Sequence, residues 1–176
     1  MTAFVALLRA VNVGGTGKLP MSELKAICEA AGFTGVRTFI ASGNVVFASS
    51  RSEAGVKAAL EAKLADYAGK PMAAMVRTAA EMAAVRDANP FPKAAPNRTV
   101  AFFLDAAPPA DAAEKAVGRR DELIALGVRE VYVYYGDGMG QSKLRIPAAA
   151  AGTARNMNTV AKLAAMAADL QERKPS

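Results

Sequence analysis

Apolar and polar positions along the first half of the chain predict strands and helices in a regular order. Residues 3–11 are mostly apolar at odd and at even positions alike, which is typical of a central strand buried on both faces. Apolar residues then recur twice at helical spacing, over 21–31 and again over 56–67. The chain also has strand-like runs at 36–41, 44–49 and 71–77. The order β-α-β-β-α-β is that of a ferredoxin-like plait.

The second half repeats most of this order. A capping box at Thr78 and Glu81 opens a helix that ends before Asn89-Pro90. Beyond it we expect a strand at 98–104, a short helix at 109–117, strands near 121–126 and 130–135, and a final helix from near Asn156, without a clear last strand. The predicted fold is therefore α+β, with two tandem ferredoxin-like (βαββα plait) units packed together.

The unit boundaries follow from a proline-rich stretch at 89–97, which is the best linker in the chain. We expect a first unit at 1–88, with a trailing helix, and a second unit at 98–176. A plait normally leaves one face of its sheet uncovered, yet the first strand is apolar on both faces. Either the second unit or a second subunit is expected to cover that face.

The amino-acid composition limits the kinds of catalytic and metal site that the chain could form. The chain contains no histidine, which removes the usual general base, the Ser-His-Asp and Cys-His systems and most zinc sites. No cofactor and no metal are expected, and whether the protein is an enzyme stays open. Cys28 lies in the apolar stripe of the first helix and is predicted to be a buried, inert thiol.

Two further features of the sequence predict where the protein resides and how strongly it binds nucleic acid. The single cysteine, the absence of a secretory signal pattern and the lack of a long apolar run predict a soluble, cytoplasmic protein without a membrane partner. The net charge is +6, but basic residues are spread along the chain without a block. Binding to nucleic acid is thus expected to be weak.

Several motifs together resemble an uncharacterised bacterial family, domain of unknown function 1697. They are residues 6–15 with Lys18, the stretches 21–24 and 39–47, the Ser-Lys-Leu at 142–144, and residues 154–160. The resemblance implies a soluble bacterial protein with tandem plait-like units and brings no established reaction. Ala10 and Met157 depart from the family pattern, which usually has a glycine and an aromatic residue there.

The first candidate site is the glycine-rich segment from Asn12 to Lys18, between a strand and a helix. Its spacing fails the Walker pattern, because Leu19 stands where a hydroxyl should bind magnesium. Backbone N–H groups around Gly14 and Gly15 are still suited to an anion, with Lys18 adding a charge. The alternative is a flexible connection without a ligand.

The hairpin tip and the last helix supply further candidates. Ser42 and Asn44 either present polar groups to a ligand or simply form a turn. Asn156 is a good N-cap by itself. Near the positive end of this helix, one arc beside the apolar stripe contains the polar residues Arg155, Asn158, Thr159 and Lys162, which are suited to an anion or carboxylate.

The leading hypothesis is a small-molecule or phosphate/anion-binding protein with a site between the glycine-rich loop and the last helix. The partner would be an anionic small molecule. The expected site consists of Arg9, Asn12, Gly14, Gly15, Lys18, Ser42, Asn44, Lys143, Arg155, Asn158 and Thr159. The alternatives are a nucleic-acid-binding plait module and a structural or regulatory module without a ligand. The oligomeric state stays open.

Overall fold

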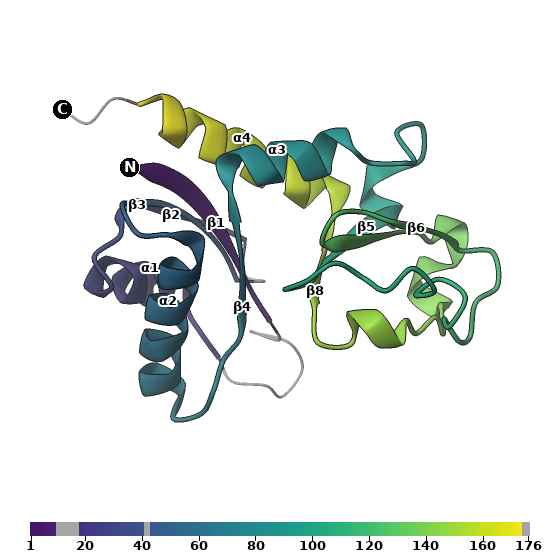
Figure 1. Cartoon of the computed structure of the whole chain (residues 1–176), viewed down its shortest axis with the longest axis horizontal. Coiled ribbons are helices and arrows are strands. Elements are labelled where there is room, and N and C mark those ends of the chain that lie inside the picture. The colour runs from purple at the N-terminus through teal and green to yellow at the C-terminus, as the bar shows by residue number, and fades with distance from the viewer. Residues whose placement is uncertain (10–17, 41–42, 174–176) are drawn as a thin grey trace. The chain divides into compact units, whose positions relative to one another are not determined.

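The computed structural model describes residues 1–9, 18–40 and 43–173 (Figure 1). The chain divides into two compact units. Unit 1 consists of Met1–Ala83 together with Lys162–Ser176, and unit 2 consists of Ala84–Ala161. Both chain ends therefore belong to the same unit.

Unit 1 contains the predicted βαββαβ order. Its elements are β1 (Thr2–Leu8), α1 (Met21–Ala30), β2 (Thr34–Phe39), β3 (Asn44–Ser49), α2 (Glu53–Ala68) and β4 (Ala74–Thr78), and the following helix α3 (Ala79–Asp87) begins in unit 1 and ends in unit 2. The strands form one antiparallel sheet in the order β2-β3-β1-β4. This order confirms the ferredoxin-like plait, in which each crossover helix packs on the same face of the sheet.

The core of unit 1 lies between that face and the helices α1 and α2 (Figure 1). Alternate residues of β1, namely Phe4, Ala6 and Leu8, point into this core, as their period of two requires. Phe47 of β3 stacks on Phe33 with ring centroids 4.2 Å apart. Burial of these side chains provides the main driving force for folding unit 1.

The opposite face of β1 is also buried. Ala3, Val5 and Leu7 are at most 1% exposed, which confirms the prediction of a central strand covered on both sides. The last helix, α4 (Met157–Glu172), contributes to this cover with its C-terminal part. The backbone N–H of Ala3 donates to the Gln171 side chain at 2.7 Å, and Gln171 donates to the Met1 carbonyl at 3.2 Å.

Unit 2 repeats the sheet but not the helices. Its elements before α4 are η1 (Pro96–Arg98), β5 (Thr99–Phe103), β6 (Leu123–Leu126), β7 (Glu130–Tyr134), η2 (Gly136–Gln141), η3 (Pro147–Ala149) and β8 (Thr153–Asn156), where η marks a 3₁₀ helix. The strand order β6-β7-β5-β8 corresponds to the order in unit 1, and every pair is antiparallel.

Two predictions for unit 2 need correction. The segment 109–117 forms turns instead of a helix, since its backbone bonds span three residues at Ala112 and Ala116 but four at Lys115. The fourth strand, β8, does exist, although its residues show no clear strand pattern. Four residues, three of them with polar side chains, are too few to show a strand period.

The end of the fourth strand is the best-matched feature of the two units. Arg77 pairs with Val5 across the sheet of unit 1, and Arg155 pairs with Ala101 at the corresponding register of unit 2. A capping residue and a helix follow in both cases. Thr78 and Glu81 form the predicted capping box, with bonds of 3.1 and 2.9 Å.

The cap of α4 uses a single side chain. The Asn156 side-chain oxygen accepts the Thr159 N–H at 3.0 Å, as predicted. Because sheet order, register, arginine and cap all recur, the two units are structural repeats of each other.

Candidate functional site

The candidate site is a hollow on the sheet of unit 2. Phe102, Leu104, Val131 and Val133 project from the sheet face that corresponds to the helix-covered face of unit 1. In unit 2 this face is covered by the turns at 109–117 and by the segment 142–150. Turns and 3₁₀ helices cover less of a sheet than two long helices do, and a cavity of about 380 Å³ remains.

The wall of the hollow is mainly apolar with two polar groups. The lining residues include the apolar Phe102, Val117 and Leu144 and the polar Tyr135 and Arg145. The remaining lining residues are Ile146, Pro147, Ala149 and Ala150. An apolar wall with a few placed polar groups is the usual composition of a small-molecule site.

A short backbone bridge holds the two covering segments together. Val117 and Arg145 exchange both backbone hydrogen bonds, each at 2.8 Å. The next residue, Gly118, has φ +73°, and a Cβ atom there would lie 2.2 Å from the Lys143 carbonyl oxygen. Glycine is therefore required at this position by both backbone conformation and space.

A carboxylate network fixes the same segments from the other end. The Ser142 hydroxyl donates to Glu122 Oε1 at 2.7 Å, and the Arg120 N–H donates to Oε2 at 2.6 Å. The Leu144 N–H donates to the Ser142 hydroxyl at 3.2 Å. The bonds from Ser142 and Arg120 stabilise the carboxylate form of Glu122 and so lower its pKa. The bond from Ser142 has the larger effect. The Ser-Lys-Leu motif thus orients Leu144 in the wall of the hollow.

Tyr135 keeps its proton. Burial, and next the negative charge of Glu122, raises the pKa of its hydroxyl. The Tyr135 hydroxyl is therefore a neutral hydrogen-bond donor and acceptor at physiological pH.

The residues predicted for the site from the first half lie in unit 1. The side chains of Arg9 and Lys18 are exposed, and the backbone N–H of Arg9 donates to the Ala73 carbonyl at 3.1 Å. Asn44 is buried, and its side-chain amide donates to the Phe39 carbonyl at 2.9 Å, a bond that supports the turn between β2 and β3. Asn12, Gly14, Gly15 and Ser42 lie outside the described residues.

The predicted residues of the second half lie in unit 2. Lys143 and Asn158 are exposed, whereas Thr159 and Arg155 are buried. Arg155 stands on β8 and not on the last helix, so the arc on which it was grouped with Asn158 and Thr159 does not include it. Its Nη1 donates to the Thr153 hydroxyl and to the Ala154 carbonyl, each at 2.8 Å.

Sequence reasoning missed the hollow, and of its candidate residues only Lys143 is adjacent in sequence to a residue of the wall, Leu144. The hollow exists because unit 2 has no long helices between its strands, and the alanine- and proline-rich stretches at 105–116 and 147–151 are the signal for that. Among the described residues, no group of acidic, cysteine or histidine side chains is arranged to hold a metal ion. No helix in the described ranges is long and apolar enough to cross a membrane.

Two antiparallel plait sheets in one chain, one under long helices and one under turns, define an α+β protein built from a repeated unit. Residues 1–132 match the family described as "protein of unknown function (DUF1697)", and the chain belongs to this family. The resemblance seen in the sequence motifs is thereby confirmed.

A solved structure gives the same fold. The conserved bacterial protein SP0830 from Streptococcus pneumoniae is similar, with a TM-score of 0.77 and 22% sequence identity. The match covers 94% of this chain and 98% of that one. No curated protein matches the chain.

Proposed function

We propose that the protein binds a small molecule with an apolar body and an anionic group, in the hollow of unit 2. The observation that carries the proposal is the uncovered part of the unit 2 sheet, where unit 1 has packed helices. The cavity volume of about 380 Å³ lies within the usual range of ligand sites, roughly 300–1,000 Å³.

The chemistry of the wall supports this ligand class. Phe102, Val117 and Leu144 offer surface to an aromatic ring or a short alkyl chain. Arg145 is an exposed lining residue, and its guanidinium would bind a carboxylate or phosphate of the ligand through paired hydrogen bonds. Tyr135 adds a neutral hydroxyl.

The site predicted between the glycine-rich loop and the last helix stays a separate proposal. Arg155 and the Thr159 N–H already have partners within unit 2. We therefore assign the anionic group of the ligand to Arg145.

The test is a thermal-shift screen of the whole chain against benzoate, octanoate and phenyl phosphate, each beside its uncharged amide or alcohol. Binding to the native state raises Tm. We expect Arg145→Gln to weaken the binding of the charged probes by about tenfold, the loss of one charge-assisted bond, and to leave the neutral probes unchanged.

Lys143→Gln is the matched control, because Lys143 is exposed and lies outside the wall of the hollow. It removes one positive charge from the same segment and should leave all affinities unchanged. Equal losses in the two variants would mean that only net charge matters. A screen without any Tm shift would contradict the proposed function.

A further inference from the structure

A second cavity in unit 2 is separate from the hollow. Its volume is about 280 Å³. It is lined by Leu104 directly after β5, by residues 105–109, and by Ala148, Ala151 and Gly152 before β8. Residues of the segment 147–151 line both cavities, but no single residue lines the two. The second cavity is therefore a candidate site in its own right.

The repeat of the two units shows which part of unit 1 corresponds to this cavity. Arg77 and Arg155 occupy the same register, so the residues three positions earlier, Ala74 in unit 1 and Gly152 in unit 2, correspond to each other. Gly152 is a lining residue of the cavity. What covers Ala74 in unit 1 therefore indicates what this part of unit 2 lacks.

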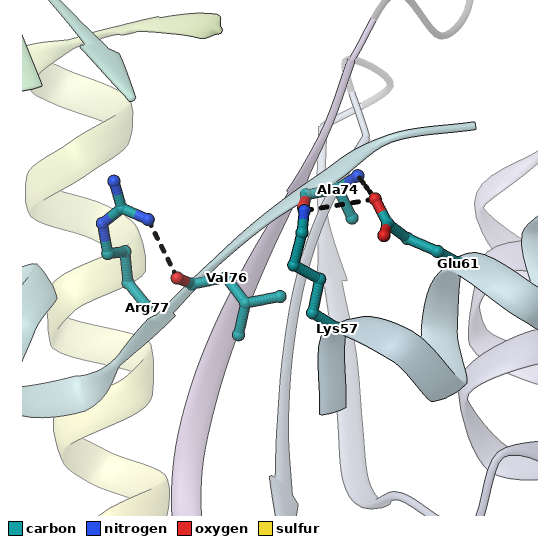
Figure 2. A network of polar contacts seen from close by, with 5 residues as sticks. All are labelled: Lys57, Glu61, Ala74, Val76 and Arg77. Carbon is teal, nitrogen blue, oxygen red and sulfur yellow. Dashed lines mark hydrogen bonds and ion pairs between the residues drawn. The ribbon is translucent and has the colours of Figure 1, made fainter. Parts of the chain in front are cut away.

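In unit 1, two side chains of α2 cover Ala74 (Figure 2). Lys57 and Glu61 form an ion pair at 3.2 Å. The Lys57 ammonium group donates to the Ala74 carbonyl, and Glu61 accepts the Ala74 N–H at 3.0 Å. Unit 1 thus holds an ammonium group between a carboxylate and a backbone carbonyl.

The second cavity contains a carboxylate and a backbone carbonyl without an ammonium group. Asp105 is an exposed lining residue, and no lining residue is basic. The Gly152 N–H donates to the Ala149 carbonyl at 3.0 Å, whereas no residue in the described ranges donates to the Gly152 carbonyl. The connection from β7 to β8 contains the 3₁₀ helices η2 and η3 in place of α2. A cation from outside the chain would complete the arrangement seen in unit 1.

Gly152 also fixes the wall of this cavity. A Cβ atom there would lie 2.5 Å from the Phe103 carbonyl oxygen and 2.7 Å from Leu104 Cδ2. Glycine is therefore required for this close approach of the segment to the end of β5. Leu104 itself is buried in the apolar cluster of unit 2, so it offers a fixed apolar surface to a ligand.

We propose that the second cavity binds a small primary alkylamine in its ammonium form. The ammonium group bonds to the Asp105 carboxylate and the Gly152 carbonyl, as that of Lys57 bonds to Glu61 and Ala74 in unit 1. The alkyl chain packs on the leucine, prolines and alanines of the wall. A primary amine has a pKa near that of lysine, about 10.4, and is charged at neutral pH.

Size and charge distinguish the ligands of the two cavities. A volume of about 280 Å³ lies just below the roughly 300–1,000 Å³ of drug-sized sites, which suits a short alkyl chain. The hollow has Arg145 in its wall and is assigned an anion, whereas the second cavity has Asp105 and is assigned a cation. Binding of an amine in the second cavity is independent of any ligand in the hollow.

An NMR titration of the ¹⁵N-labelled whole chain with n-butylamine at neutral pH tests the proposal. The probe has the same alkyl chain and ammonium group as a lysine side chain, and butan-1-ol is its uncharged counterpart. We expect saturable shifts of the Asp105 and Gly152 amide signals with the amine. The alcohol should bind about tenfold more weakly, because it loses a charge-assisted bond. Absence of saturable shifts, or equal affinity for the two probes, overturns the proposal.

Substitutions then locate the site. Asp105→Asn should weaken amine binding by about tenfold. Asp121→Asn is the matched control, because Asp121 is exposed in the same unit but outside the cavity, and it should leave the affinity unchanged.

A third variant decides the matter where circular dichroism shows that Asp105→Asn does not fold. Ala151→Leu adds bulk at an exposed position of the wall, leaves Asp105 in place and should also weaken amine binding by about tenfold. An amine affinity that the two aspartate substitutions change equally, or that Ala151→Leu leaves unchanged, overturns the proposal.

Discussion

Arg155 illustrates how the element that carries a residue determines its partners. On β8 its guanidinium is buried and donates to the Thr153 hydroxyl and the Ala154 carbonyl. Burial lowers the pKa of this guanidinium to about 10, so the group stays charged at neutral pH. A buried charge requires hydrogen-bond partners, and these two acceptors provide part of them.

Replacing Arg155 with alanine should therefore destabilise the protein. The acceptors on Thr153 and Ala154 would lose a donor, and we expect the free energy of unfolding in urea to fall by about 1–3 kcal/mol. Arg120→Ala is the control, because this exposed side chain lies in the same unit, and it should change stability by less than about 0.5 kcal/mol. Equal stability of the two variants would show that Arg155 is not a structural residue.

Cys28 is the residue whose chemistry is most clearly suppressed. Burial, and secondarily Glu29, raises the pKa of its thiol from 9.0 to about 12. The thiolate is the reactive form, so iodoacetamide at pH 8 should label the native protein very slowly and the urea-unfolded protein readily. Mass spectrometry reads this at a single site, because the chain has one cysteine.

The same shift makes stability depend on pH. Between pH 9.0 and about 12 the unfolded thiol loses its proton while the native thiol keeps it. The contribution of Cys28 to the free energy of unfolding is therefore complete below pH 9.0 and declines as pH rises towards 12. Cys28→Ala should show a flatter decline in this range, and identical pH profiles would contradict the burial of the thiol.

At the scale of elements, the bridge between Val117 and Arg145 determines whether the hollow exists. Gly118→Ala would place a Cβ 2.2 Å from the Lys143 carbonyl oxygen, at a φ of +73° that alanine rarely adopts. We expect a loss of more than about 1 kcal/mol of stability, together with the loss of any ligand bound in the hollow.

Gly138 provides the matched control for this change. A Cβ atom there meets nothing within 4 Å among the described residues, and its φ is not in the left-handed region. Gly138→Ala should leave both Tm and ligand affinity unchanged. If both variants bind the ligand like the wild type, the bridge does not shape the site.

At the scale of the whole molecule, net charge bears on nucleic acid binding. The charge of +6 is distributed over the chain without a basic block. We expect only weak binding to RNA or DNA, lost at physiological salt, with log K falling by about 0.7–0.9 per log unit of salt for each phosphate contacted. Fluorescence anisotropy across a salt series measures this slope. Sequence-selective binding that resists salt would instead support a nucleic-acid module.

The fold was more predictable than the site. Unit 1 could be read from the sequence because its helices have large apolar residues at regular spacing, such as Val56, Leu60 and Leu64. Unit 2 was harder, since Thr153 to Asn156 form a strand too short to show a period. The hollow could not be predicted, because it is the part of the unit 2 sheet that the covering turns leave open. Apolar spacing predicts which elements form, and it does not predict how much of a sheet they cover.

The discontinuity of unit 1 has a consequence for synthesis. Ala3 and its partner Gln171 are 168 residues apart, so the ribosome makes β1 long before the helix that bonds to it. At about 5–20 residues per second, this delay is on the order of 10–30 s. During that time the nascent plait of unit 1 lacks the C-terminal part of α4 over Ala3, and its apolar face is available to chaperones.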